Sequence, residues 1–303
     1  MKQGKDSETG LRIASDTGEE IRANVSDNTL KAYEHATRKL EDWLDGRMLN
    51  DAVLAEYIRF LHTEGKSPAT INLLLSAVKW MAEYHGIANV AGAITKCAWS
   101  NIRGEDRPRR QRRPDGLTWG EVERVCTVAE SSETVAGLRD AAMISLMSDC
   151  LLRISEAVAV DVKDIGEEGL QIHRGDRSDI LYICEWTRQL IKHYRRKSGI
   201  ASGALFRRIR FQNHVTEDRL GVKGAREAIR RRAAEAGVEG CISGHSLRLG
   251  SAVSLVEAGA TVSEVQQAGR WQGPTMPARY VREMPAEQSP VKRYKDKNQT
   301  DTD

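Results

Sequence analysis

Apolar residues recur at three- and four-residue steps along most of the chain, which is the period of an amphipathic helix. In the first hundred residues this pattern predicts four helices without a strand between them: one between Ser26 and Gly46, one near 51–64, one opening at Ser67-Pro68, and a shorter one near 89–98. Residues 1–25 are polar and aperiodic, which predicts a disordered tail. Residues 26–102 are therefore expected to form a compact all-α domain.

A second domain is predicted at 117–283. Thr118 and Glu121 have the spacing of a helix capping box, and helices follow near 119–130 and 136–150. Alternating apolar and polar residues over 158–184 predict a short three-stranded sheet, and the helical period then returns near 186–197, 222–236, 246–258, 261–269 and 274–281. The fold class is thus mainly α with a small antiparallel sheet, an all-α domain joined to an α+β domain.

The segment between the domains, 103–116, holds two prolines, two glycines and many charges, which predicts a basic linker. Residues 284–303 form a charged C-terminal tail. The net charge is only +3, but residues 103–113 carry six arginines against two acidic residues, and 192–232 carry thirteen Lys and Arg against three. A solvated helix face explains one such run; two of them favour nucleic acid as the partner.

Several classes of protein are excluded at this point. No apolar stretch approaches the ~20 residues of a membrane-spanning helix, and the first residues lack the apolar core of a secretory signal. The five cysteines are scattered without a C-x-x-C pair, so we expect reduced thiols in a cytoplasmic protein rather than a zinc site or a disulfide framework. Neither a G-x-G-x-x-G nor a Walker motif occurs, and no cofactor is expected.

Five residues have side chains suited to chemistry on a phosphate. His245 and Arg248 lie three apart at the start of a predicted helix, where free backbone N–H groups also favour an anion. Arg153 lies in the apolar segment LLRISEA and needs an anion there, and Glu156 could pair with it. Tyr280 could serve as a nucleophile. Each residue alone is equally well explained as a packed or solvated side chain.

Taken in order, Arg153, His245-x-x-Arg248, Trp271 and Tyr280 resemble the signature of the tyrosine recombinases (phage integrase family), most closely the Cre-like recombinases. The resemblance implies that 26–102 is a SAM-like core-binding domain and 117–283 the catalytic domain. Tyr280 would attack DNA and form a 3′-phosphotyrosyl link without metal or ATP. Arg153 and Arg248 would clamp the phosphate, His245 would give acid–base help, and the Trp271 indole would donate a hydrogen bond.

The chain departs from the family pattern in one hairpin. The family places a lysine there as general acid for the leaving 5′-oxygen, but residues 171–183 contain none. Arg177 is the expected substitute, although an arginine rarely gives up a proton. Either Arg177 acts by its charge, or His245 or water supplies the proton, or cleavage is slow. Glu156 is expected to orient the site.

The expected partner is double-stranded DNA carrying a specific recombination site. The protein would be a monomer or weak oligomer when free and a homo-tetramer on paired sites, in a prokaryotic cytoplasm, associated with the nucleoid or a mobile element. The predicted DNA contacts are all basic: Arg107, Arg109, Arg110, Arg112, Arg113, Arg207, Arg208, Arg210, Lys223, Arg226, Arg230, Arg231 and Arg232.

Two other functions use the same residues. A type IB topoisomerase shares the chemistry, but the linker and the core-binding domain favour a recombinase. A non-catalytic DNA-binding regulator is the second alternative, and the presence of all five signature residues argues against it.

Overall fold

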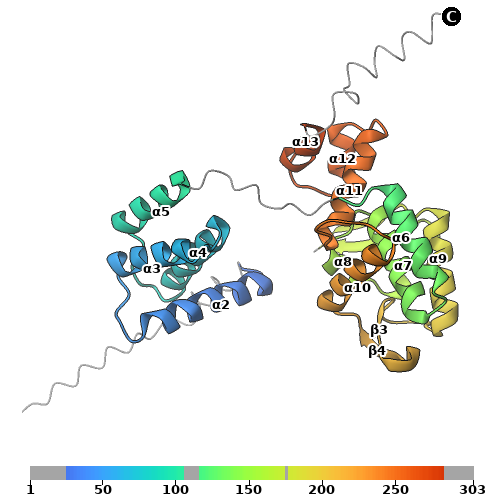
Figure 1. The fold of residues 1–303 in the computed structure, drawn as a ribbon, viewed down its shortest axis with the longest axis horizontal. Helices are drawn as coiled ribbons and strands as arrows, with labels where there is room; N and C mark the ends of the chain where they lie inside the picture. The colour runs from blue at the N-terminus through green and yellow to red at the C-terminus, as the bar shows by residue number, and fades with distance from the viewer. Residues whose placement is uncertain (1–24, 106–115, 175–176, 283–303) are drawn as a thin grey trace, which may run out of the picture. The chain divides into compact units, whose positions relative to one another are not determined.

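A computed structural model describes residues 25–105, 116–174 and 177–282, without the side chains of Glu105, Arg174, Arg177, Gln212 and residues 279–282, which include Tyr280. The chain forms two compact units, Met1–Gln111 and Arg112–Asp303, and each is described by itself (Figure 1). The point of division falls inside the segment predicted as a linker. Within the described residues no helix is long and apolar enough to cross a membrane.

Unit 1 is a four-helix domain, as the apolar pattern predicts. Its helices are α2 (Asp27–Leu44), α3 (Asp51–Thr63), α4 (Pro68–Tyr84) and α5 (Ala93–Glu105). Side-chain oxygens of Ser26, Asn50 and Ser67 accept backbone N–H groups at the first three helix starts, which satisfies donors that have no partner within the helix. Helix α2 packs on α4 and α3 packs on α5 around one apolar core.

Helix α5 differs from the prediction at both ends. It begins at Ala93 rather than near 89 and continues to Glu105, three residues into the predicted linker. The Asp51 carboxylate accepts N–H groups of Gly92, Ile94 and Thr95 at 2.8–2.9 Å and so caps α5 from another helix. These bonds, and above all the Thr95 hydroxyl, lower the Asp51 pKa to about 2. A cap more than forty residues away along the chain cannot be found from local periodicity.

Unit 2 is built around one buried helix, α7 (Val135–Asp149), which packs against α6, α8, α9, α10 and α11. Thirteen of its fifteen residues are buried, which explains why its apolar residues do not form a single stripe. The other helices are α6 (Trp119–Ser131), α8 (Ile154–Ala159), α9 (Glu185–Ser198), α10 (Val222–Glu235), α11 (Gly244–Glu257), α12 (Val262–Ala268) and α13 (Thr275–Arg282). Helices α12 and α13 pack on each other at one end of the unit (Figure 1).

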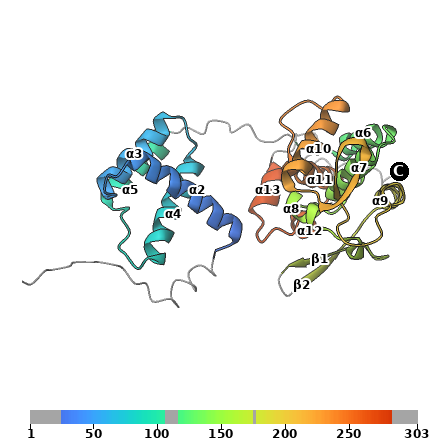
Figure 2. The ribbon, with the colours of Figure 1, turned by 90° about the horizontal axis from the view of Figure 1, so that it is seen from below.

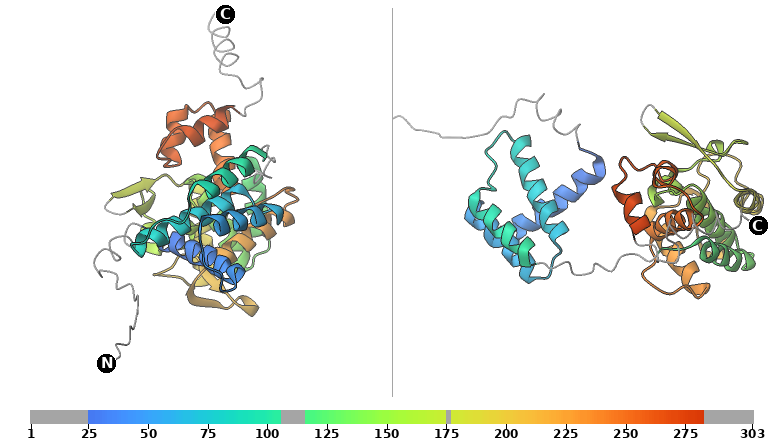
Figure 3. Two further views of the ribbon diagram at one scale, coloured as in Figure 1. Left: turned by 90° about the vertical axis from the view of Figure 1, so that its left-hand side faces the viewer. Right: turned by 90° about the horizontal axis from the view of Figure 1, so that it is seen from above.

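The predicted three-stranded sheet is wrong in its first strand. The sheet at this place is a hairpin of β1 (Leu170–Arg174) and β2 (Arg177–Leu181), paired antiparallel, and it extends away from the helices (Figure 2, Figure 3). The preceding segment forms α8 and a 3₁₀ turn, Val162–Asp164, and Asp161 bridges Ala204 instead. A short apolar run fits a strand and a buried helical turn equally well.

A second hairpin was not predicted. It pairs β3 (Arg207–Ile209) with β4 (Val215–Arg219), and a 3₁₀ turn, Phe211–Asn213, joins them. Charged residues dominate the sequences of both strands, and such a pattern is typical of a solvated basic segment rather than of a half-buried sheet. The pairing depends on backbone hydrogen bonds, which the side-chain pattern does not reveal.

The start of unit 2 crosses closely over α11. The Leu117 N–H donates to the Ser246 carbonyl at 3.0 Å, and a β-carbon at Gly250 would lie 1.7 Å from the Leu117 carbonyl oxygen. Only glycine therefore fits at position 250. This crossing fixes α11, the helix that carries His245 and Arg248.

Candidate active site

The site begins at the turn between α7 and α8. Leu151 adopts left-handed backbone angles, with φ of 46°, and turns the chain so that Arg153 stands at the start of α8. The Glu156 carboxylate accepts the Arg153 backbone N–H at 2.9 Å and its guanidinium Nη1 at 2.8 Å. The Arg153 side chain remains 48% exposed. Arg153 therefore lies at the surface with a partner, and not in the apolar surroundings that its flanking residues suggest.

Helix α11 supplies the next two residues. Ser243 caps its start by accepting the His245 N–H at 3.2 Å, and His245 stays exposed in the first turn. One turn later Arg248 is only 2% exposed. Its Nη1 donates to the Leu151 carbonyl at 2.5 Å and its Nη2 donates to the Gly269 carbonyl. The helix thus ties the Arg153 turn to the turn that follows α12.

The turn after α12 brings Trp271 to the site. The Arg248 guanidinium lies over the indole ring, 4.3 Å from the ring centroid, a favourable cation–π geometry. The neighbouring Arg270 is 9% exposed and donates from Nη2 to the Glu156 carboxylate at 3.0 Å. Arg153, Glu156, His245, Arg248 and Trp271 thus come together from three separate segments of the chain.

Positive charge dominates the electrostatics of the candidate active site. Partial burial lowers the pKa of His245, and the charges of Arg248 and Arg153 lower it further, so the imidazole is neutral at pH 7. Burial raises the pKa of Glu156, but the Arg153 N–H and the Arg270 charge outweigh it and hold that pKa below its ordinary value. The site therefore combines a neutral imidazole with one ionised carboxylate and several guanidinium groups.

Two predicted site residues are placed by their backbone alone. Tyr280 lies in α13, which packs against both α11 and α12. Arg177 is the first residue of β2 and pairs with Arg174 of β1. The side chains of Tyr280 and Arg177 lie outside the described residues, so their roles stay predictions.

Most of the predicted DNA contacts in unit 2 are exposed. Lys223, Arg226 and Arg230 follow one another at three- and four-residue steps on the exposed face of α10, and Arg208 and Arg210 are exposed on the β3–β4 hairpin. Arg230 also donates to the Ile242 carbonyl at 3.2 Å. The linker residues Arg107, Arg109, Arg110, Arg112 and Arg113 lie outside the described residues.

Two of the predicted DNA contacts, Arg207 and Arg232, have largely buried side chains. The Arg207 side chain is 11% exposed and pairs with Glu217 at 2.5 Å, while it also donates to the carbonyls of Ala204 and Ser202. The Arg232 side chain is 8% exposed and pairs with Asp140 and Glu235 at 3.0 and 2.7 Å. Both guanidinium groups have partners within the protein, and their contact with DNA stays a prediction.

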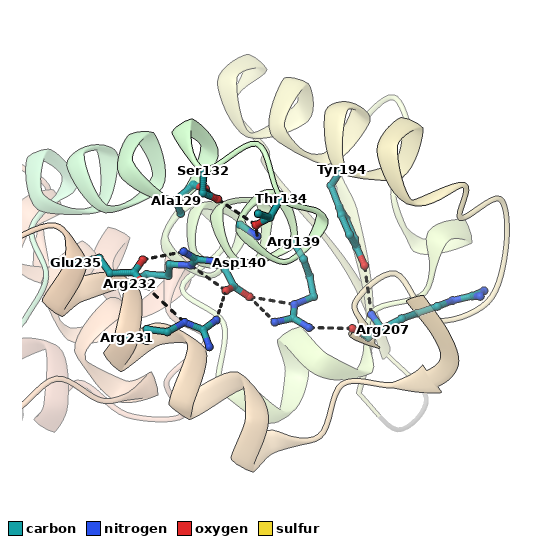
Figure 4. Close-up of polar contacts among 11 residues, drawn as sticks. Ala129, Ser132, Thr134, Arg139, Asp140, Tyr194, Arg207, Arg231, Arg232 and Glu235 are labelled. Atoms are coloured by element: carbon teal, nitrogen blue, oxygen red, sulfur yellow. Dashed lines mark hydrogen bonds and ion pairs between the residues drawn. The ribbon is translucent and has the colours of Figure 1, made fainter. Parts of the chain in front are cut away.

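Arg232 belongs to a group that we call the Asp140 cluster: Asp140 with Arg139, Arg231 and Arg232 (Figure 4). The Asp140 side chain is completely buried, and all three guanidinium groups lie 2.7–3.0 Å from its oxygens. Arg139 and Asp140 are on α7, while Arg231 and Arg232 are on α10. Arg231 is 52% exposed and is the one member that keeps a surface position. The cluster fixes α10, which carries several of the predicted DNA contacts, to the core.

Sequence reasoning missed Arg270 and Asp140. Trp271 was found through the family signature, but the arginine before it is one of many in a basic chain and carries no signal of its own. Asp140 occupies a position in a mostly apolar run, where a charged residue must find a partner. That signal was available, although it does not identify the partners on α10.

Comparison with known proteins agrees with this geometry. Residues 116–287 match the phage integrase family, and residues 20–84 match the N-terminal SAM-like domain of phage integrases. The tyrosine recombinase XerD of Listeria innocua is 25% identical over 82% of this chain and 85% of its own length. The recombinase cre of Escherichia phage P1 is 23% identical over 89% of this chain and 91% of its own length. The XerH site-specific recombinase, solved in a post-cleavage complex with palindromic difH substrate, matches 89% of this chain and 81% of its own, with a TM-score of 0.65 at 18% identity.

The family match alone spans more than half of the chain. The chain therefore belongs to the phage integrase family, and the class of enzyme that its fold and site define is the tyrosine site-specific recombinases. The expected likeness to Cre-like recombinases holds at a modest level, beside a similar likeness to XerD.

Proposed function

We propose that this protein recombines DNA at a specific site through a 3′-phosphotyrosyl intermediate on Tyr280. The observation that carries the proposal is the convergence of Arg153, His245 and Arg248 in unit 2. His245 and Arg248 share α11, and the Arg248 guanidinium donates to the Leu151 carbonyl in the turn that leads to Arg153. Helix α13, which carries Tyr280, packs on the His245 helix. A donor-rich positive site suits the attack of a phenol on a phosphodiester.

In the proposed reaction the Tyr280 phenolic oxygen attacks phosphorus, and the bond from phosphorus to the 5′-oxygen breaks. The phenol proton passes to a base, and the leaving 5′-oxygen takes up a proton. Neutral His245 suits the accepting role. The 5′-hydroxyl of a partner strand then attacks the phosphotyrosyl link and releases Tyr280. One phosphodiester is exchanged for another ester of similar energy, so the steps need neither metal nor ATP.

The two clamp arginines would act differently. Exposed Arg153 can reach a non-bridging oxygen directly and can exchange part of its contact with Glu156 for the phosphate. Arg248 is buried against two carbonyls and the Trp271 ring. From this buried position it would stabilise the negative charge that develops on the phosphate in the transition state. Trp271 would support Arg248 in addition to its predicted role as a hydrogen-bond donor.

Arg177 is proposed to stand where the family has a lysine. As a guanidinium it would stabilise the leaving oxygen by its charge, and the proton would come from His245 or water. An Arg177→Lys variant should keep or raise the cleavage rate, and Arg177→Ala should lower it.

The proposed DNA partner is held by the basic linker and by the exposed face of α10, with Lys223, Arg226 and Arg230 against the backbone or the major groove. A palindromic site of the kind bound by XerH takes two subunits by symmetry. Two paired sites would then assemble four copies of this chain, which would be monomeric or weakly associated without DNA, in the cytoplasm.

A nicked DNA substrate tests this proposal. The bound site is first selected from a genomic DNA pool, and a nick is placed so that cleavage releases a short fragment and traps the enzyme. Wild type should become covalently attached to the 3′ side, while Tyr280→Phe should bind with the same affinity and remain free. Trapping by both proteins, or by neither on a tightly bound site, would overturn the proposal. Supercoiled DNA with one and with two sites separates recombination from simple relaxation by a topoisomerase.

A further inference from the structure

Arg270 lies behind the proposed active site and belongs to none of the expected roles. It is on the turn between α12 and α13, and its side chain is 5% exposed. The guanidinium donates from Nη1 to the Cys150 carbonyl at 2.9 Å, and from Nη2 to the Glu156 carboxylate at 3.0 Å and the Leu151 carbonyl at 3.4 Å. These three acceptors lie just before and just after Arg153 in the chain.

The position of Arg270 is unfavourable for an arginine in two respects. Its backbone has a φ of 54°, a left-handed conformation in which glycine is the usual residue. Its Nε is buried and has no hydrogen-bond partner among the described residues, and a buried charge is stable only with an ionised partner. Glu156 is the ionised group that it contacts, so the energetics of Arg270 and Glu156 depend on each other.

The Glu156 carboxylate contacts both Arg270 and Arg153, so the position of one arginine affects the other. One carboxylate oxygen, Oε1, accepts from the Arg153 guanidinium at 2.8 Å. The other, Oε2, accepts both the Arg153 backbone N–H and the Arg270 guanidinium, at 2.9 and 3.0 Å. Arg270 therefore fixes the carboxylate plane and leaves Oε1 directed at Arg153. Without Arg270, Glu156 Oε2 would keep its bond to the Arg153 N–H but lose its bond to the guanidinium of residue 270.

The same residue connects this assembly to the segment that leads to Tyr280. The Leu151 carbonyl accepts from both Arg248 and Arg270, and Gly269, beside Arg270, accepts from Arg248. Four residues separate Arg270 from the first residue of α13. A contact that holds position 270 against the Arg153 turn thus limits where α13 can begin.

We propose that Arg270 is a positioning residue, which holds Glu156 so that Arg153 faces the scissile phosphate and which ties the start of the Tyr280 segment to the Arg153 turn. The predicted change in cleavage rate rests on the proposed function. The predicted positions of Glu156 and of the turn before α13 rest on the contacts alone. Arg270 does not touch DNA in this account. Its effect should therefore appear in the rate of cleavage and not in the affinity for DNA.

The kinetic test is a double-mutant cycle of Arg270→Met and Glu156→Gln on the nicked substrate. Each single change should slow formation of the covalent complex by about 10–100-fold, as small displacements of reacting groups do, with the DNA Kd unchanged. The double variant should be no slower than the worse single variant, because the two residues act as a unit. Arg270→Lys should recover part of the rate, since an ammonium can still pair with Oε2.

Arg188→Met is the matched control. Arg188 also donates to two backbone carbonyls, of Gly166 and Glu167, both at 2.8 Å, and takes no part in the site. Its loss removes comparable bonds, so cleavage should proceed at the wild-type rate. Two results would overturn the positioning role: multiplicative effects of the two changes on the cleavage rate, or a wild-type cleavage rate for Arg270→Met at an unchanged melting temperature. The proposed function would stand in either case.

A second measurement does not depend on cleavage. The ¹³C chemical shift of the Glu156 carboxyl, followed with pH, should show a higher midpoint in Arg270→Met than in wild type, a smaller rise in Arg270→Lys, and no change in Arg188→Met. If wild type traps no DNA, the proposed function fails, and this titration alone decides the structural part. An unchanged Glu156 midpoint in Arg270→Met would overturn it.

Discussion

Two carboxylates in unit 2 each collect arginines, and they do so in opposite surroundings. Asp140 is completely buried, and its contacts with Arg139, Arg231 and Arg232 join α7 to α10. Glu156 is 18% exposed and pairs with buried Arg270 on one side and with half-exposed Arg153 on the other. All the contacts of Asp140 in this cluster are with arginines of the protein, and none is open to a ligand. The Glu156 group keeps one arginine at the surface, where a phosphate can bind it.

This contrast explains how similar chemistry can serve two purposes. A fully buried ion pair is hard to break without leaving an uncompensated charge, so it fixes a geometry. A partly exposed pair contributes less to stability, because water screens it, but it can exchange partners at small cost. Arginine content alone therefore does not indicate which residues meet DNA; the exposure of each guanidinium and its partners decide.

The largest effect is expected for Asp140→Asn. The change leaves three guanidinium groups around a neutral amide in the interior of unit 2. Breaking a buried ion pair on one side costs about 3–5 kcal/mol, and the free energy of unfolding in urea should fall by that amount. A loss below about 1 kcal/mol would show that the cluster does not hold α10 on the core.

The two faces of α10 should respond differently to the same substitution. Arg232→Met removes a buried, charged hydrogen-bonding group and should lower the free energy of unfolding by about 2 kcal/mol. Arg226→Met, on the exposed face, should leave stability unchanged and weaken DNA binding, with the salt dependence of log K reduced by about one charge. Urea unfolding and binding at several salt concentrations measure the two effects. Equal effects of both variants on DNA affinity at full stability would contradict the assignment.

A smaller loss of stability is expected for Glu156→Gln, about 1–2 kcal/mol, because the amide oxygen still accepts the Arg153 N–H. The pH dependence provides a further check. The folded-state pKa of Glu156 lies below its ordinary value of 4.5, so its contribution is fully present above that pH and is lost as the pH falls through the lowered pKa. Wild type should lose stability in this acid range more steeply than Glu156→Gln. Parallel pH curves would contradict the pairing of Glu156 with the two arginines.

The smallest effect concerns His245. Its pKa lies below the ordinary value of 6.5, because of partial burial and the charges of Arg248 and Arg153. An NMR titration of the imidazole should give a midpoint below 6.5, and Arg153→Ala should shift it upward. The neutral ring favours folding above pH 6.5, and this contribution is lost as the pH falls through the lowered pKa. A midpoint unaffected by Arg153→Ala would place the two side chains further apart than in the structure.

Local signals made most of the helices predictable. Ser26, Thr118 and Ser67-Pro68 mark helix starts that the structure confirms, because caps act within one turn of the chain. The ends of α5 and the β3–β4 hairpin were missed, since both depend on partners distant in sequence or on backbone pairing. The same division applies to the site. The order of its residue types could be read from the sequence, whereas the burial of Arg248 and the roles of Arg270 and Asp140 depend on tertiary contacts.

The central claim is that Tyr280 becomes bonded to DNA, and mass spectrometry of the trapped complex tests it most directly. After digestion of the complex with protease and nuclease, the account predicts a nucleotide adduct on the peptide that contains Tyr280, and no adduct in the Tyr280→Phe protein. An adduct on a peptide without Tyr280, or an adduct that persists in Tyr280→Phe, would contradict it.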